Sequence, residues 1–347
     1  MEIADASYLT NLASGYCNDS WAAGIHLSLH KQQISRQGRV LRLLFGLLRI
    51  FRKSSAIADE KVYLARKRAS EDRWSGKFKP IAPIQCEPVI ANGVPAEWIA
   101  GPELDAHDPT SPTILYLHGG SFTGGSIASH RPLCGSIAHV AQARTLLIEY
   151  RLAPEYPFPT ALDDALAAYR WLLETGTKPK RIVIAGDSSG GGLALSALIA
   201  LRDNGTPLPA ATVCLSAITD LACDSKSWDT NAKYELFGDV ISARRSMKMY
   251  LNGADPRTPL SSPLYADLAG LPPWFMQIGT REVLLADSTR FAQKAHNAGV
   301  DVTLDIWREM VHSWQFAAQF LPEGRAAIEK IGEFIKCHVG SSPVQSF

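Results

Sequence analysis

Residues 181–192 read Arg-Ile-Val-Ile-Ala-Gly-Asp-Ser-Ser-Gly-Gly-Gly, a short apolar run that leads into a serine framed by glycines. The apolar run is typical of a buried strand, and the small residues that continue to about residue 202 favour a helix. A sharp turn between a strand and a helix holds a serine in strained backbone geometry, and flanking glycines avoid clashes there. Such a turn also surrounds the hydroxyl with backbone N–H groups. The sequence therefore predicts Ser188 as a nucleophile, because the glycine frame centres on it rather than on Ser189.

Strand and helix patterns alternate on both sides of this turn. Further runs typical of buried strands lie at 113–117, 145–149, 211–217, 274–278 and 302–307, and an alternating run at 96–100 favours an early edge strand. Helical patterns lie at 161–174, 287–298 and 323–337. Alternation of this kind over about 250 residues predicts an α/β fold, with a largely parallel sheet covered by helices on both faces.

A second glycine-rich stretch, Leu117-His-Gly-Gly-Ser-Phe-Thr-Gly-Gly125, follows directly on the strand predicted at 113–117. In acyl transfer, negative charge develops on the carbonyl oxygen of the substrate, and fixed N–H donors stabilise it. Glycines let the backbone approach a substrate closely. A phosphate-binding loop would end in Lys followed by Ser or Thr, and this stretch lacks that ending. The stretch therefore predicts an oxyanion-binding loop.

A serine in this kind of turn is activated by a carboxylate and a histidine that follow it along the chain in that order. Three histidines lie well beyond Ser188. His296 falls within a predicted helix, where a surface position is expected, and His338 ends the last helix, where a cation suits the helix dipole. His312 lies in the loop after the strand predicted at 302–307, from which it can reach the nucleophile. We therefore expect His312 to be the general base.

The carboxylate is expected in the loop after the strand predicted at 274–278. Glu282 and Asp287 are the two candidates in Gly279-Thr-Arg-Glu-Val-Leu-Leu-Ala-Asp287. Glu282 lies nearer the end of the strand, where its side chain can point toward the histidine. Asp287 opens the next predicted helix, where a capping or first-turn acid is expected. We favour Glu282 and leave Asp287 as the alternative.

These stretches together resemble the hormone-sensitive-lipase-like family (family IV) of bacterial-type esterases within the α/β-hydrolase superfamily. The resemblance covers roughly 94–321 and is carried by four ordered motifs: Tyr-Leu-His-Gly-Gly at 116–120, Glu-Tyr-Arg-Leu-Ala-Pro-Glu at 149–155 with Pro-Phe-Pro at 157–159, Gly-Asp-Ser-Ser-Gly-Gly at 186–191, and Glu-Val-Leu at 282–284 with His312. It implies an α/β-hydrolase fold with an eight-stranded, mostly parallel sheet flanked by helices. It also implies an N-terminal helical cap, so we divide the chain into a cap segment at 1–80 and a catalytic domain at 81–347.

The resemblance further implies an oxyanion hole of backbone N–H groups, from Gly119, Gly120 and Ser121 in the glycine-rich loop together with Ser189. Within this set Gly119 also helps to shape the loop. The sequence departs from the family pattern at three of the site positions. The family usually has a third glycine where Ser121 stands, often alanine where Ser189 stands, and commonly aspartate where Glu282 stands. The first two positions act through their backbone, so activity is expected to survive.

The expected function is hydrolysis of short-to-medium acyl esters through an acyl-enzyme on Ser188. Lactone, amide or carbonate cleavage would use the same residues. A non-catalytic small-molecule receptor on this scaffold would typically lack a triad member, whereas here all three positions are filled. A lipid-associated lipase is a further alternative, because 41–53 combines helical apolar spacing with interleaved arginines; a helix packed on the rest of the protein is the simpler reading.

Overall composition is ordinary for a globular protein of 347 residues, and a net charge of +1 gives no strong field toward nucleic acid or membranes. Charge is nevertheless uneven, with 14 Lys and Arg against four Asp and Glu between Lys31 and Lys79. The six scattered cysteines suggest reduced thiols, and neither a signal peptide nor a spanning apolar run is recognisable. We therefore expect a cytoplasmic protein. No metal-ligand spacing implies a cofactor, and the family resemblance mildly favours a homodimer.

Overall fold

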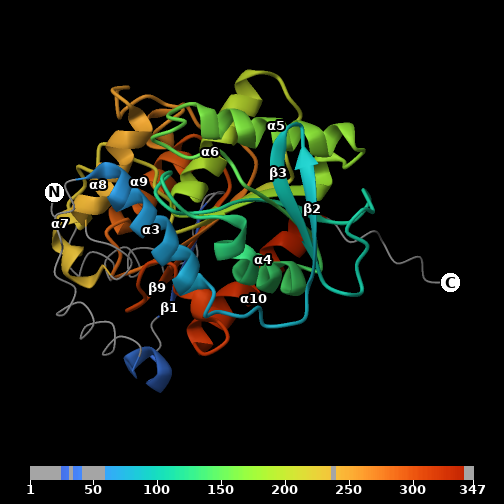
Figure 1. Ribbon diagram of the computed structural model, residues 1–347, viewed down its shortest axis with the longest axis horizontal. Helices are drawn as coiled ribbons and strands as arrows, with labels where there is room; N and C mark the ends of the chain where they lie inside the picture. The colour runs from blue at the N-terminus through green and yellow to red at the C-terminus, as the bar shows by residue number, and fades with distance from the viewer. Residues whose placement is uncertain (1–24, 31–33, 41–58, 236–239, 340–347) are drawn as a thin grey trace.

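A single mixed sheet forms the centre of the protein (Figure 1). The computed structural model describes residues 25–30, 34–40, 59–235 and 240–339. Within these residues the sheet has nine strands in the order β1-β9-β8-β7-β6-β4-β5-β3-β2. All neighbouring strands are parallel except for the pairs that β3 makes with β2 and β5. The strands are β1 (Ile25–His30), β2 (Gln85–Ala91), β3 (Val94–Ala100), β4 (Thr113–Leu117), β5 (Arg144–Ile148), β6 (Ile182–Asp187), β7 (Ala211–Leu215), β8 (Trp274–Gly279) and β9 (Val302–Trp307).

The helices follow the predicted alternation. They are α3 (Glu60–Ser75), α4 (Ile127–Ala141), α5 (Thr160–Glu174), α6 (Ser189–Asp203), α7 (Ser227–Thr230), α8 (Val240–Leu251), α9 (Leu285–Asn297) and α10 (Pro322–Val339), with short 3-10 turns η1 (Pro179–Arg181), η2 (Ala232–Tyr234), η3 (Pro263–Tyr265) and η4 (Trp314–Ala317). The predicted architecture, a mostly parallel sheet flanked by helices, is confirmed.

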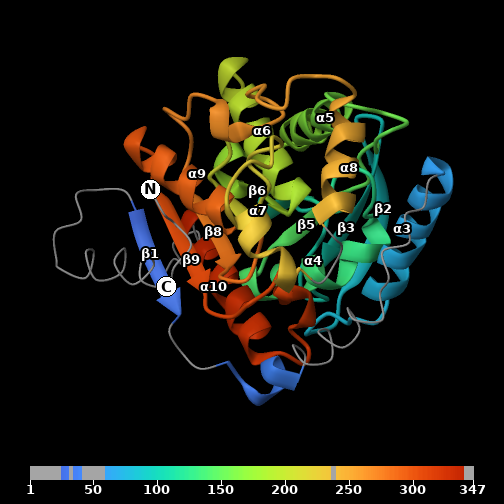
Figure 2. The same cartoon turned by 90° about the vertical axis from the view of Figure 1, so that its left-hand side faces the viewer.

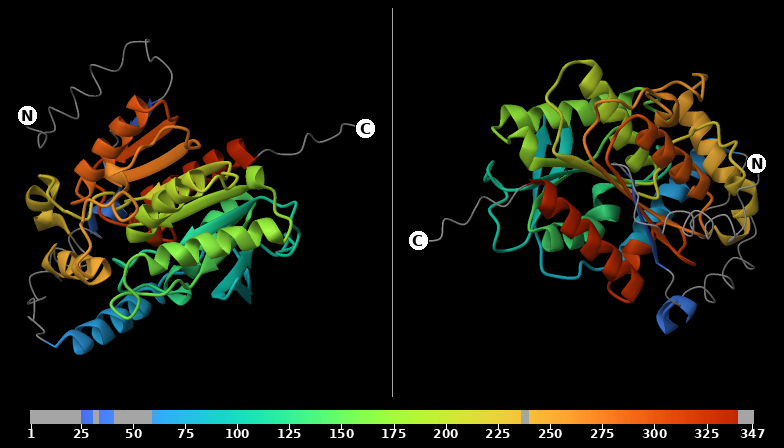
Figure 3. Two further views of the ribbon diagram at one scale, coloured as in Figure 1. Left: turned by 90° about the horizontal axis from the view of Figure 1, so that it is seen from above. Right: turned by 180° about the vertical axis from the view of Figure 1, so that it is seen from behind.

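Alternation along the strands divides the apolar side chains between two cores. In β4, Leu115 and Leu117 belong to the core that includes α5, α6 and α9. Ile114 and Tyr116, which point the other way, belong to the core under α4 and α10. Figure 3 shows α10 crossing this second face in the view from behind. Helices on both faces explain why the central strands are apolar throughout rather than alternating with polar residues.

The expected strand count of eight is corrected to nine by β1, which comes from the segment expected to be a wholly helical cap (Figure 2). The sequence Ile-His-Leu-Ser-Leu-His at 25–30 alternates apolar and polar residues, as a half-buried strand does. Its partner is β9, in parallel, and Leu27 and Leu29 pack against the core. The imidazole of His30 is also fixed to the buried carboxylate of Asp305, with 2.7 Å between Nε2 and Oδ1. The strand therefore completes the sheet at an edge that β9 would otherwise leave open.

The opposite edge also differs from the sequence prediction. The run at 96–100 was expected as an edge strand, but β3 lies one strand in, and β2 takes the edge. Pro88 lies in β2. A proline cannot donate a backbone hydrogen bond, so it is tolerated on an edge strand.

Three sequence expectations concern features outside the site. The basic, amphipathic stretch at 41–53 lies outside the described residues. Five of the six cysteines are described, and all five are free thiols. In the part of the chain that the structure describes, no helix combines the length and apolar character that a membrane span requires.

Candidate active site

Ser188 occupies the turn between β6, which ends at Asp187, and α6, which begins at Ser189. Its backbone has φ 53° and ψ −120°, a combination that costs energy for any residue with a side chain. The turn is held by neighbouring backbone, because Ser188 N–H donates to Leu215 O at 2.8 Å and Ser188 O accepts from Ile218 N–H at 3.0 Å. A Cβ at Gly190 would collide with the carbonyl oxygen of Leu117. The glycine therefore lets α6 begin directly against β4.

His312 and Glu282 are brought together across two adjacent strands. Glu282 follows β8 and His312 follows β9, and the two strands are parallel neighbours, so their carboxyl ends meet at one edge of the sheet. The distance from His312 Nδ1 to Glu282 Oε2 is 2.9 Å. A carboxylate only accepts hydrogen bonds, so Nδ1 carries a proton, and Nε2 has a free lone pair in the neutral form of the imidazole. Among the described residues the Ser188 hydroxyl makes no hydrogen bond to His312; such contacts commonly tighten only when substrate binds.

The electrostatic environment of His312 favours its protonated form. Burial alone lowers the pKa of this imidazole, because it penalises the charged state. The hydrogen bond that His312 donates to Glu282, together with the negative charges of Glu282, Glu235 and Asp187, outweighs that effect and raises the pKa to about 9. The site is therefore arranged to accept a proton onto His312.

Glu282 is held by groups on two strands. Its Oε1 accepts from the hydroxyl of Ser216 at 2.9 Å and from Gly279 N–H at 2.6 Å, and its side chain is fully buried. Ser216, which follows β7, was missed by the sequence reasoning. Its place directly after a buried strand was the available signal, but nothing local distinguishes it from other serines. These contacts leave Oε2 for the histidine.

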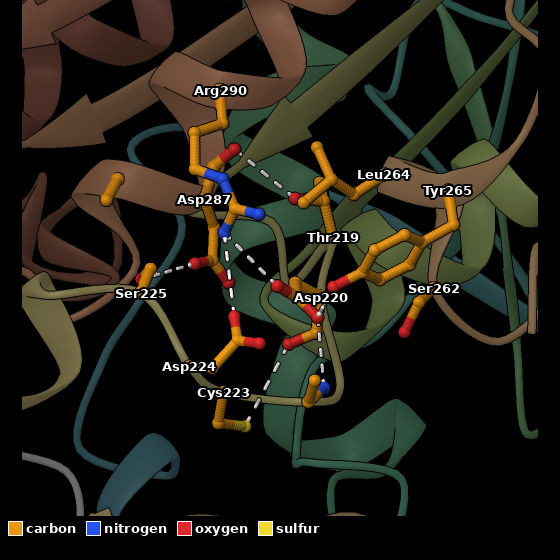
Figure 4. Close-up of polar contacts among 12 residues, drawn as sticks. Thr219, Asp220, Cys223, Asp224, Ser225, Ser262, Leu264, Tyr265, Asp287 and Arg290 are labelled. Atoms are coloured by element: carbon orange, nitrogen blue, oxygen red, sulfur yellow. Dashed lines mark hydrogen bonds and ion pairs between the residues drawn. The ribbon is translucent and has the colours of Figure 1, made fainter. Parts of the chain in front are cut away.

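Asp287, the alternative acid, lies in a separate polar cluster (Figure 4). Its Oδ1 accepts from the Ser225 hydroxyl at 2.9 Å, and neither oxygen contacts His312. The nearby Asp220 bonds Tyr265 and Arg290. Burial raises the pKa of Asp287 to about 8, so this carboxyl is protonated at neutral pH. A protonated carboxyl that contacts Ser225 rather than His312 cannot orient the histidine, and the geometry therefore favours Glu282.

The glycine-rich loop lies between β4 and α4, and its backbone visits the left-handed region at three successive residues, with φ 129° at Gly120, 55° at Ser121 and 62° at Phe122. Within the described chain, the N–H groups of Gly120, Ser121 and Ser189 donate to no other group of the protein. Buried or half-buried backbone donors are rarely left unpaired without a reason. These three N–H groups are among the four that the sequence predicts as oxyanion donors.

Gly119, the fourth expected donor, requires a correction. Its N–H donates to Asp187 Oδ1 at 3.0 Å and approaches His130 Nε2 at 3.1 Å. This donor is therefore engaged inside the protein and is not free for a substrate. Asp187 also accepts from Tyr116 OH at 3.0 Å. Burial by itself raises the pKa of Asp187, but the positive charge of His130 and the hydrogen bonds of His130 and Tyr116 bring it below its usual value.

Comparison with known proteins identifies the family to which the chain belongs. A family model described as "alpha/beta hydrolase fold" matches residues 114–316. The chain is 45% identical to an acetyl-hydrolase of Streptomyces hygroscopicus over 79% of this chain and 90% of that protein. It is 35% identical to an esterase of Acinetobacter venetianus over 72% of this chain and 82% of that protein. A solved esterase of the bacterial hormone-sensitive lipase family superposes with a TM-score of 0.80 at 41% identity, over 89% of this chain and all of that one.

These matches define the class. The chain belongs to the α/β hydrolases, and within them to the hormone-sensitive-lipase-like esterases of family IV. It is a carboxylic ester hydrolase.

Proposed function

We propose that the protein hydrolyses short-to-medium acyl esters through an acyl-enzyme on Ser188, with His312 as general base and Glu282 as the carboxylate that orients it. The observation that carries the proposal is the hydrogen bond from His312 Nδ1 to Glu282 Oε2, formed at the edge of the sheet where the Ser188 turn also lies. A fixed Nδ1 proton leaves Nε2 free to take the hydroxyl proton of Ser188.

The chemical steps follow from these positions. Ser188 Oγ attacks the ester carbonyl while its proton passes to His312 Nε2, and the N–H groups of Gly120, Ser121 and Ser189 stabilise the resulting oxyanion. The intermediate collapses when His312 gives that proton to the departing alcohol. A water molecule then attacks the acyl-enzyme while its proton passes to His312 Nε2, and His312 returns this proton to Ser188 Oγ as the Oγ–acyl bond breaks and the acid is released. Glu282 stabilises the imidazolium in both halves of the cycle without taking the proton.

The relatives support a short acyl group. One curated relative, at 45% identity, is named an acetyl-hydrolase. We therefore expect acetyl and butyryl esters to be better substrates than long-chain ones.

The homodimer expected from the family resemblance stays a prediction, and light scattering of the purified protein checks it. Of the cap expected at 1–80, α3 supports the assignment because it contacts the glycine-rich loop, whereas β1 belongs to the sheet.

The test is turnover of p-nitrophenyl esters from acetate to palmitate, with a lactone and an anilide included to examine the alternative bonds. Wild type should hydrolyse the short esters fastest, and Ser188→Ala should reduce kcat by about 10⁴-fold or more. Ser188→Ala retaining wild-type turnover would exclude the proposed nucleophile. Binding of esters without turnover by the wild type would favour the receptor alternative instead.

A further inference from the structure

The helix α3 reaches the oxyanion loop through a lysine. Lys67 Nζ donates to the carbonyl oxygen of Gly120 at 2.7 Å. Gly120 O also accepts from Gly124 N–H at 3.0 Å and from Thr123 N–H at 3.2 Å. Three donors, one of them a full positive charge, therefore converge on a single carbonyl of the loop.

The carbonyl that Lys67 contacts belongs to the same peptide unit as one of the expected oxyanion donors. Gly120 C=O and Ser121 N–H belong to the same planar trans peptide unit, in which the two groups point in opposite directions. Holding the oxygen toward α3 therefore aims Ser121 N–H away from α3, as an oxyanion donor requires. We propose that Lys67 is a positioning residue for catalysis, which fixes and polarises the Gly120–Ser121 peptide so that Ser121 N–H stabilises the transition state; this inference rests on the proposed function.

The neighbouring peptide units are held in the same manner. Gly119 O accepts from His118 Nδ1 at 2.8 Å, and the N–H of that peptide unit belongs to Gly120, the second expected donor. His118 O accepts from Tyr150 OH at 2.6 Å, and the N–H of that unit is the one that Gly119 gives to Asp187. Each of three consecutive carbonyls thus has a side-chain donor. Only the donor at Gly120 is a cation, and only it comes from the N-terminal segment.

The rest of α3 keeps Lys67 in place. Glu71 Oε1 lies 3.0 Å from Lys67 Nζ, and Glu71 Oε2 accepts from Gly125 N–H at 2.8 Å. Arg68 donates to Thr123 O at 2.9 Å. A side chain at Gly124 would meet both Glu71 Oε2 and Lys67 Nζ. The helix therefore lies against the loop on one charged face, and the missing side chain at Gly124 makes that approach possible.

A positive charge on a peptide oxygen strengthens the N–H of the same unit as a donor, because hydrogen bonds in a chain polarise one another. The gain is realised when charge develops on the substrate oxygen, so it should appear in kcat rather than in KM. Complete loss of one oxyanion donor costs about 10²–10³-fold in kcat. Gly120 O keeps two backbone donors without Lys67, so we expect a smaller loss, about 10-fold.

The experiment compares Lys67→Met, Lys67→Gln and Lys67→Arg with wild type and with Arg66→Met, a matched control at an exposed position of the same helix. Turnover of p-nitrophenyl butyrate is measured per active site titrated with a fluorophosphonate, so that unfolded protein does not count. The affinity for an alkyl trifluoromethyl ketone, whose adduct with the serine carries the oxyanion, is measured in parallel. Among the variants at position 67, kcat per titrated active site should be highest for Lys67→Arg, lower for Lys67→Gln and lowest for Lys67→Met, and the affinity for the ketone should fall in the same order. The KM of these variants should stay near the wild-type value. Both kcat and ketone affinity of Arg66→Met should also stay near wild type.

The inference is overturned if titrated kcat of the Met and Gln variants equals that of wild type, if the loss lies in KM alone, or if Arg66→Met shows the same loss. Should the Met variant fail to fold, the Gln and Arg variants carry the same comparison. Ser188→Ala separates the two proposals. Ester turnover that does not depend on Ser188 refutes the proposed function, whereas Ser188-dependent turnover that is insensitive to Lys67 overturns this inference alone.

Discussion

Replacing Glu282 by glutamine removes the charge that faces His312 while keeping the size of the side chain. The pKa of His312 is about 9 against an ordinary 6.5. At about 1.4 kcal/mol for each pH unit, this difference corresponds to ~3 kcal/mol in favour of the imidazolium. Because the imidazolium forms as the ester is attacked, Glu282→Gln should lower kcat by about 10²-fold on the alkaline plateau.

The pH dependence supplies a second signature of the same change. In the wild type, kcat/KM should rise with pH through a limb near the pKa of His312, about 9, because the base must be unprotonated. Without the carboxylate, burial is left to act on the imidazole, and the limb should move to lower pH. The assay is p-nitrophenyl butyrate hydrolysis over the pH range, corrected for spontaneous hydrolysis, with the imidazole titration followed by NMR.

Asp287→Asn is the matched control, since it removes the other candidate carboxyl, which lies in the first turn of α9. Asp287→Asn should not change the pH at which kcat/KM rises. If Glu282→Gln changed neither the pH at which kcat/KM rises nor kcat on the alkaline plateau, the assignment of Glu282 would be refuted. If Asp287→Asn instead produced both effects, Asp287 would be the acid.

Three further predictions concern stability, each measured by urea unfolding. Burial raises the pKa of Asp287 to about 8 from an ordinary 3.8, so between these values the folded protein holds a proton that the unfolded chain has lost, and this group makes stability fall as pH rises. Asp287→Asn should remove that slope, about 1.4 kcal/mol per pH unit, and a slope that persists would contradict the buried, protonated carboxyl. Gly190→Ala should cost about 1–3 kcal/mol or more because its methyl would meet the backbone of β4, whereas Gly101→Ala, with open space around it, should be nearly neutral; equal effects would be inconsistent with this account. Asp305→Ala leaves three side-chain donors around a buried carboxylate site without their acceptor and should cost about 3–5 kcal/mol, and a cost below about 1 kcal/mol would count against the network.

The parts of the site that the sequence predicted are those set by local geometry. The turn around Ser188 needs glycines at fixed positions, and the oxyanion loop needs one at Gly120, where φ is 129°, so both leave a readable pattern. Glu282 and His312 were found because parallel strands end at one edge of the sheet, which makes the loops after consecutive strands neighbours. The alternation of strand and helix patterns predicted the helices on both faces of the sheet.

What the sequence did not reveal depends on contacts between distant segments. The alternation in β1 was visible in principle, but six residues carry little signal, and their partner lies at the other end of the chain. The charged residues of α3 have the composition of an ordinary solvated helix, so nothing distinguished Lys67 from Arg66. Gly119 could not be separated from Gly120 as a donor, because that depends on where the Asp187 carboxylate turns. Each of these is a fact of tertiary packing.

The pairing of β1 with β9 has a consequence for synthesis of the chain. Val302, which pairs with Ile25, is made about 280 residues later, and at about 5–20 residues per second the ribosome needs about 15–60 s to cover that distance. Over this interval the central strands can assemble in order while the first strand has no template. Although it is synthesised before every other strand of this sheet, β1 is therefore among the last to join it, and a nascent chain stalled before β9 would carry β1 unpaired.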